Sequence, residues 1–287
     1  MALRDIKQRI KSIKSTKQIT KAMNLVATSK LQRVKGRVIS ARPFLQEVRK
    51  VISSLILQTE KLENVYVEQR PVENTLIIII SGDRGLCGAY NANIIKQSIK
   101  SISERKNVKL VVLGSKAVKF FTDGEHEIVR YMTGISDKPF YDDAAQIGTL
   151  AREMFESGEV DEVFVSYTKF ESMLSYKPVT ESVLPIDVTQ FSFKDEAQQE
   201  YYDIMEFEPK AEVILEQLLP KYINVLLFDA MLESAACELA ARSASMDSAT
   251  KNAEDRIEEM SLAYNRARQS VITKEIIEVV AGANALQ

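Results

Sequence analysis

The glycine cluster Gly82–Gly88 contains the residue types that come nearest to a cofactor-binding motif. It follows a β-branched run, Thr75–Ser81, and precedes a helical pattern, which is where a dinucleotide-binding fingerprint would lie. Its spacing is GxxGxxG instead of GxGxxG, and the cluster has no lysine followed by serine or threonine. A carboxylate at Asp83 would also repel a pyrophosphate. We therefore expect a tight structural turn here and no bound cofactor.

Catalytic nucleophiles and metal ligands show no recognisable arrangement. The single histidine, His126, lies in the segment FTDGEHE, where a solvated loop residue is a better interpretation than a ligand. The two cysteines, Cys87 and Cys237, form neither a CxxC pair nor a Cys/His cluster of the kind that binds zinc. The pattern indicates neither a Ser/His/Asp nor a Cys/His catalytic set. We expect a non-catalytic protein without a metal site, in a reducing cytosolic setting.

Strand and helix patterns alternate between residues 74 and 208. An alternation of this kind predicts a layered, Rossmann-like α/β domain with a mainly parallel sheet. The run TLIIIIS is typical of a strand that is buried on both faces. The expected strands are Thr75–Ser81, Lys109–Leu113, Asp161–Tyr167 and Val179–Ile186, and the expected helices are Asn91–Ile102, Ser115–Phe121 and Asp142–Ser157.

The two ends of the chain carry an apolar or small residue at every seventh position, which marks a helix whose buried face meets a partner helix. Two such ends predict a long antiparallel coiled coil with the α/β domain inserted, divided as residues 1–62, 74–208 and 209–287. Pro43 should kink the first helix or make it locally irregular. The N-terminal series is Ile6, Ile13, Thr20, Ala27, Val34, Ala41, Val48, Leu55 and Leu62, with companions Ile10, Leu31, Val38, Leu45 and Ile52. The C-terminal series is Val225, Leu232, Leu239, Met246, Ala253, Met260 and Ala267.

Polar residues interrupt both series. The N-terminal series weakens at Lys17, Thr20 and Asn24, and the C-terminal one places Arg242 and Arg256 at companion positions that are normally apolar. Arginines there need carboxylate partners, either within the chain, such as Glu238 or Glu259, or on another subunit.

The C-terminal helix is longer than the N-terminal one, so its end should extend beyond its partner. That end, Val271–Leu286, is apolar on most sides, and such a helix is not stable as a solvated rod. We expect another protein to cover it; the alternative is an end that folds back or aggregates.

Charge is unevenly distributed. Residues 1–50 carry 14 basic and 2 acidic residues, so residues 51–287 sum to −14 in a chain of net charge −2. This favours an acidic partner for the N-terminal helix, with a solvated basic face as the alternative. A nucleic-acid binder is disfavoured because the helix has no aromatic residue before Phe44. A nucleotide-binding enzyme with a coiled-coil dimerisation arm is a second alternative. No apolar run reaches membrane-spanning length.

Three segments in order, Ile13–Arg37, Ser81–Asn91 (SGDRGLCGAYN) and Ala241–Leu286, resemble the gamma subunit of F-type ATP synthase, and the resemblance extends over nearly the whole chain. It implies a central-stalk rotor inside a ring of three alpha and three beta subunits, whose body and foot bind the epsilon subunit and the membrane c-ring. It implies no nucleic-acid partner. The absence of an inserted cysteine pair and of a transit peptide favours a bacterial form, peripheral on the cytoplasmic face of the cell membrane.

The resemblance also implies roles for individual residues. The proposed contacts between rotor and stator are Met23, Lys30, Arg242, Arg268, Gln269, Thr273 and Glu275. The tip that turns in an apolar sleeve comprises Ile276, Ile277, Val279, Val280 and Leu286. The foot that meets the c-ring and epsilon subunit comprises Tyr201, Tyr202, Glu206 and Glu208.

Overall fold

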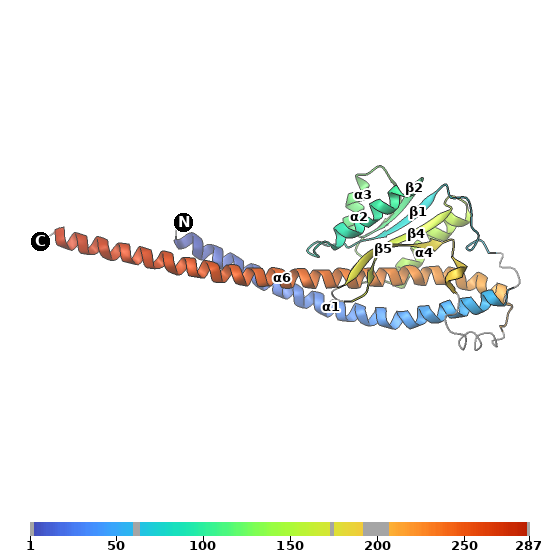
Figure 1. Ribbon diagram of the computed structural model, residues 1–287, viewed down its shortest axis with the longest axis horizontal. Helices are drawn as coiled ribbons and strands as arrows, with labels where there is room; N and C mark the ends of the chain where they lie inside the picture. Colours follow the sequence, from blue (N-terminus) through green and yellow to red (C-terminus); the bar gives the residue numbers. More distant parts are fainter. Residues whose placement is uncertain (1–2, 60–63, 173–174, 192–206, 286–287) are drawn as a thin grey trace. The chain divides into compact units, whose positions relative to one another are not determined.

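The computed structural model describes residues 3–59, 64–172, 175–191 and 207–285. The chain forms two compact units: residues 1–28 with 242–287, here the terminal unit, and residues 29–241, the body unit. Two long helices, α1 (Leu3–Leu57) and α6 (Ala211–Ala285), contribute to both units (Figure 1).

A five-stranded sheet forms the centre of the body unit, with the strand order β3-β2-β1-β4-β5 (Figure 1). Neighbours among the first four strands of this order run parallel, and β5 runs antiparallel to β4. The predicted α/β fold with a mainly parallel sheet is therefore confirmed. The strands are β1 (Thr75–Ile80), β2 (Val108–Leu113), β3 (Glu127–Met132), β4 (Glu162–Phe170) and β5 (Tyr176–Leu184).

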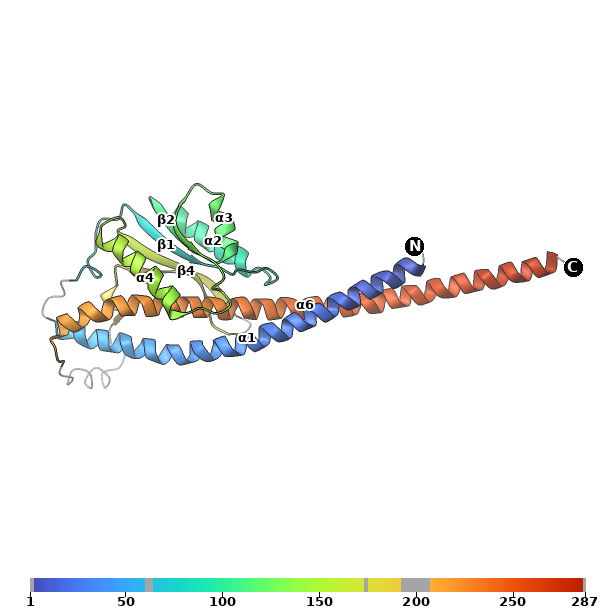
Figure 2. The same cartoon turned by 180° about the vertical axis from the view of Figure 1, so that it is seen from behind.

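Helices cover both faces of this sheet. The side chains of β1 alternate between the two faces, and all of them are buried. Ile77 and Ile79 pack in one apolar cluster with residues of α2 and α3. Leu76, Ile78 and Ile80 pack in a larger cluster with α4, α1 and α6. Figure 2 shows α4 on the side of the sheet nearer α6. The helices are α2 (Tyr90–Ser103), α3 (Ser115–Thr122) and α4 (Tyr141–Glu156), and a short 3-10 helix, η1, spans Val188–Phe191.

Within the body unit, α6 is held to the sheet by polar contacts as well as by apolar packing. The Phe170 backbone N–H donates to Oε2 of Glu233 at 3.1 Å, and the Thr168 N–H donates to Oγ of Ser234 at 3.2 Å. Tyr90 of α2 donates its hydroxyl to the Ser234 carbonyl. The buried carboxylate and hydroxyl of α6 thus satisfy backbone groups of β4, and this fixes the helix against the strand.

The seven-residue series in α1 agrees with the burial of its side chains. Every described member from Ile6 to Leu55 is buried or half-buried, and so is each predicted companion. Leu62 lies outside the described residues. In the body unit the series is mostly apolar and tightly buried, as at Ile52 and Leu55, which have no exposed surface. Pro43 lies within α1, which is one continuous helix on either side of it.

Polar layers join α1 and α6 in the terminal unit. The hydroxyls of Thr20 and Thr250 are 2.8 Å apart, and Oγ of Ser243 donates to Oδ1 of Asn24 at 2.7 Å. Lys17 pairs with Glu254 at 2.8 Å. Partner numbers on α6 rise as those on α1 fall, so the helices run antiparallel, as predicted.

Two expectations are wrong. Strand β3 was not expected, because its sequence EIVRYM mixes charged and apolar residues, and it lies at the edge of the sheet with exposed and half-buried positions. Arg256 was expected among the buried companions, but its side chain is 70% exposed. It pairs with Glu259 on the same helix, which is one of the two partners expected within the chain. Ile257 occupies the inward position instead. From Met246 onward, the spacing between successive inward positions of α6 alternates between four and three residues. The inward position that follows Ala253 is therefore Ile257, one residue beyond Arg256.

Candidate functional site

The exposed end of α6 is the most distinctive surface of the terminal unit. Every described side chain from Arg268 to Ala281 is exposed, including large apolar ones. Figure 1 shows α6 extending past the first turns of α1 in this unit. The exposed fractions are 59% for Ile276, 62% for Ile277, 71% for Val279 and 53% for Val280. A helical segment with this much apolar surface gains stability when another protein covers it.

Four of the predicted contact residues lie on the same exposed segment. Arg268, Gln269, Thr273 and Glu275 alternate with the apolar residues around α6. The segment therefore presents both apolar groups and hydrogen-bonding groups to a partner, which is the composition of a protein interface.

The first turns of α1 present an exposed basic face. Asp5 is the one acidic residue in the part of α1 that belongs to the terminal unit. Lys17, which is half-buried, pairs with Glu254. The exposed cations here are Arg4, Lys7, Arg9, Lys11, Lys14 and Lys21. This face matches an acidic partner by charge.

The structure separates the other predicted contact residues. Met23 is half-buried and Arg242 is 7% exposed, both in the terminal unit. Lys30 belongs to the body unit, where its ammonium group pairs with Asp137 at 2.7 Å. Arg242 and Lys30 are thus already engaged within the chain or largely buried, whereas the residues from Arg268 to Glu275 are open to a partner.

Of the four predicted foot residues, the structure describes one. Tyr201, Tyr202 and Glu206 lie outside the described residues, as does Leu286 of the tip. Glu208 is described and is exposed just before α6 begins.

Several exposed apolar residues of the terminal unit were missed by the sequence analysis. Ile19, Leu25 and Val26 of α1 are 60%, 65% and 57% exposed, and Leu262 of α6 is 56% exposed. These residues are apolar but do not belong to the seven-residue series, whose members face the partner helix. An apolar residue outside the series was therefore the signal in the sequence that could have identified this exposed surface. They extend the surface available to a partner from the tip onto the paired part of the helices.

The glycine cluster of the body unit is a structural turn at the carboxyl end of β1. The Asp83 carboxylate accepts hydrogen bonds from the backbone N–H groups of Ser115, Gly134 and Ser136, at 2.9–3.0 Å, and from the Ser115 hydroxyl at 2.8 Å. Burial raises the pKa of Asp83, but these four donors outweigh it and lower the pKa to about 2. Asp83 therefore holds the loops after β1, β2 and β3 together and occupies the position where a pyrophosphate would bind in a dinucleotide-binding fold.

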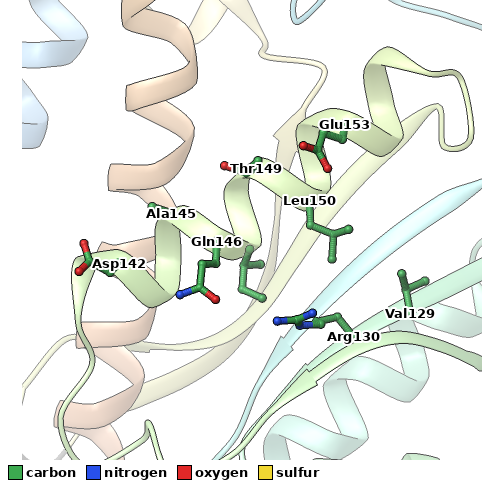
Figure 3. A pocket seen from close by; sticks show the side chains of 9 residues that line it. Val129, Arg130, Asp142, Ala145, Gln146, Thr149, Leu150 and Glu153 are labelled. Carbon is green, nitrogen blue, oxygen red and sulfur yellow. The ribbon is translucent and has the colours of Figure 1, made fainter.

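A pocket of about 570 Å³ lies between β3 and α4 of the body unit. Figure 3 shows Arg130 of β3 on one wall and Asp142, Gln146 and Glu153 of α4 on the other. Among its described lining residues are one guanidinium, two carboxylates and the Thr149 hydroxyl, but neither histidine nor cysteine. This set offers no nucleophile with an adjacent base. Across the described residues, no group of three or more His, Cys, Asp or Glu side chains is placed to hold a metal ion.

Comparisons with known proteins agree with the arrangement of the elements. The family model of ATP synthase, "ATP-synt", matches residues 2–286. The ATP synthase gamma chain of Alkaliphilus metalliredigens is 38% identical over 287 residues, which is 100% of this chain and 99% of that protein. The one from Heliobacterium modesticaldum is 41% identical over 286 residues, 99% of each chain. The chain belongs to the ATP synthase gamma chain family.

Solved structures share the fold of this gamma chain family member. A chain from the F1 and c-ring portion of the Euglena gracilis mitochondrial ATP synthase matches with a TM-score of 0.67 at 17% identity, covering 99% of this chain and 94% of that one. A chain from the central stalk and c-ring of the Tetrahymena thermophila enzyme matches with a TM-score of 0.60 at 22% identity, covering 80% and 99%. In the part of this gamma chain that the structure describes, no helix is both long and apolar enough to cross a membrane.

Proposed function

We propose that this chain is the central-stalk rotor subunit of a bacterial ATP synthase and has no active site of its own. The observation that carries the proposal is the exposed apolar end of α6, from Val271 to Val280, in a chain of this family. Such a segment needs a surrounding partner. The names of the similar structures, which come from a central stalk and from rotor and c-ring assemblies, support the same conclusion.

The partners are three alpha and three beta subunits around the paired helices, with the epsilon subunit and the c-ring at the foot. In this arrangement the basic face of α1 meets acidic surfaces of the ring. The tip comprises Ile276, Ile277, Val279, Val280 and Leu286, and the foot comprises Tyr201, Tyr202, Glu206 and Glu208. The subunit is peripheral, on the cytoplasmic face of the membrane, and reaches the bilayer only through the complex.

The mechanism is mechanical: it requires that the terminal unit make different contacts with each of the three beta subunits. The terminal unit is asymmetric: in its described part, one side of the α6 tip carries Arg268 and Glu275 and the first turns of α1 carry an excess of cations. Three identical beta subunits around it therefore meet three different surfaces. A partner shifts a conformational equilibrium only by the difference in its contact energy with the two states. Rotation driven by ion flow through the c-ring changes which beta subunit receives each set of contacts, and so its affinity for nucleotide.

The proposal can be tested by replacing Ile276, Ile277 and Val280 with serine and co-expressing the chain with alpha, beta and epsilon subunits. We expect a lower yield of the complex and slower ATP turnover, because the apolar contact with the ring is lost. The isolated chain should unfold at an unchanged temperature, since these side chains are exposed within it.

Ile99→Ser is a matched control, because Ile99 is also a helical isoleucine, 45% exposed, but lies on α2 of the body unit. It should leave assembly and turnover unchanged. Assembly and turnover of the tip variant equal to those of the wild type would contradict a role for the tip as a bearing.

A further inference from the structure

A polar cleft of about 420 Å³ lies in the body unit between α1, α6 and the β4–β5 hairpin. It is distinct from the surfaces that carry the proposed function. Cations and carboxylates face each other in it from every surrounding element. They are Arg42 and Arg49 from α1, Lys169 from β4, Glu181 from β5, and Asp229 and Glu233 from α6, with the Tyr167 hydroxyl beside them.

Most of these charges are already paired. Glu233 is buried and accepts from Arg42 at 3.1 Å and from the Phe170 N–H at 3.1 Å. Glu181 accepts from Lys169 at 3.0 Å and from the Tyr167 hydroxyl at 2.9 Å. These carboxylates therefore have both of their oxygens satisfied.

Asp229 is the exception in the cleft. It lies one helical turn before Glu233 on α6, and its Oδ1 is buried without a hydrogen-bond partner among the described residues. A buried carboxylate with an unsatisfied oxygen is unfavourable when ionised, and the nearby Glu233 charge adds repulsion. A proton on Asp229 removes the cost of the buried charge and the repulsion from Glu233.

Arg49 is the cation best placed to respond. It lines this cleft and also the adjoining one that is bounded by Tyr222 and Asp187. Its positive charge lowers the pKa of Tyr222 and of Asp229, against the burial that raises both. Within the described part of the chain, no carboxylate pairs with Arg49, whereas Arg42 and Lys169 each have one.

We propose that the cleft is a proton-operated contact between α1 and α6. Arg49 stays in the adjoining cleft beside Tyr222 while Asp229 is protonated, and it turns to pair with Asp229 when that proton is lost to solvent. The exchange moves the Arg49 side chain between the two adjoining clefts that it lines. It changes the number of ion pairs that hold α1 to α6 beside the sheet.

The electrostatics place this exchange close to neutral pH. Burial and, to a smaller extent, the Glu233 charge raise the pKa of Asp229 to about 6, against the opposing effects of Arg42, Arg49 and Lys169. Because the folded-state pKa is above that of the unfolded chain, the folded state binds the extra proton between the two values. The stability that this proton contributes is present at low pH and is lost as the pH rises through about 6.

The first test is a titration of the carboxyl carbons of the full-length chain, labelled with ¹³C at aspartate and followed by NMR. We expect one aspartate resonance, identified by its absence in Asp229→Asn, to titrate with a midpoint near 6. A midpoint near the ordinary aspartate value of about 4 would overturn the proposal. If the variant does not fold, sequential assignment of the wild-type resonance gives the same answer.

The second test is a double-mutant cycle of Asp229→Asn and Arg49→Gln, with the free energy of unfolding measured by denaturant at pH 5 and pH 8. We expect a coupling equivalent to about a fivefold change in the unfolding equilibrium constant at pH 8, as for a strong partly exposed ion pair, and none at pH 5. Lys50→Gln is the control in place of Arg49→Gln, because Lys50 is the next residue and pairs with Glu47 instead. Equal coupling at the two pH values, or equal coupling with the control, would contradict the exchange.

Discussion

The paired helices are built differently in the body unit and in the terminal unit. In the body unit α1 and α6 bury large apolar side chains against each other and against the sheet, with Ile52 and Leu55 fully covered. In the terminal unit few described positions are buried, and half of them are the small or hydroxyl-bearing residues Thr20, Ala27 and Ala253, beside Ile6, Arg242 and Met246. Because burial of apolar area supplies most of the stability of a fold, the terminal pair gains much less from its own contacts.

This difference teaches that one coiled coil serves two purposes. The part beside the sheet is stabilised within the chain. The terminal part keeps its register by hydrogen bonds at Thr20–Thr250 and Ser243–Asn24, which are directional but contribute little net free energy. Under the proposed function a partner covers its exposed apolar surface, and binding of that partner would stabilise it further.

The largest effect is expected for Ile52→Ala in the body unit. Ile52 is fully buried in the main apolar cluster, so its truncation loses transfer free energy and leaves a cavity, at a cost of about 3–4 kcal/mol. Denaturant unfolding of the isolated chain measures it. The matched variant in the terminal unit is Ile13→Ala, which should cost about 1 kcal/mol because Ile13 is only half-buried. Equal losses for the two would remove the contrast between the units.

The next largest effect is expected for Asp83→Ala, at roughly 2–3 kcal/mol, since four donors lose a charged acceptor. The folded-state pKa of Asp83 is below its ordinary value of 3.8, so its contribution is present above pH 3.8 and is lost as the pH falls toward 2. Unfolding curves between pH 2 and 7 should therefore converge for wild type and variant at the acid end. Asp123→Ala, at an exposed position after α3, serves as the control and should shift the curve little at any pH.

A smaller effect, about 1 kcal/mol, is expected for Thr20→Val in the terminal unit. The substitution keeps the shape but removes a hydroxyl that contacts Thr250 at 2.8 Å. The double variant Thr20→Val and Thr250→Val should recover most of the loss, because an apolar pair of the same shape leaves no unsatisfied group facing its partner. Amide hydrogen exchange in α1 and α6 reports the local change. Additive losses in the double variant would indicate that the two hydroxyls act independently.

The smallest effect is expected for Lys17→Ala, which removes the ion pair with Glu254. The hydrogen bond from Lys17 and its charge lower the pKa of Glu254, but both side chains are substantially exposed, so water and salt screen the interaction. The helical content of the terminal unit should fall slightly at low ionic strength. At 1 M salt the wild type and the variant should be indistinguishable, and a persistent difference there would mean that Lys17 acts through packing.

Local periodicity predicted the helices and their buried positions with success, because a helix presents every third or fourth residue to its partner whatever lies elsewhere in the chain. The same reasoning identified the weak section at Thr20 and Asn24, which the structure shows as hydrogen-bonded layers. The same reasoning wrongly assigned Arg256 to a buried position. The inward position after Ala253 lies four residues along α6, at Ile257, and not three residues along, at Arg256. Local periodicity also missed β3, whose edge position leaves no alternation of buried and exposed side chains to recognise.

The sequence by itself determined the two long helices, the mainly parallel α/β sheet and the apolar end of α6, because each depends on the order and spacing of residues within one segment. Only the tertiary structure decided the roles of Asp83 and Asp229. The partners of Asp83 come from loops 32 to 53 residues further along the chain. The charges that face Asp229 come from α1, β4, β5 and α6. A carboxylate acquires its pKa from the groups that folding brings around it, and no spacing in the sequence records those groups.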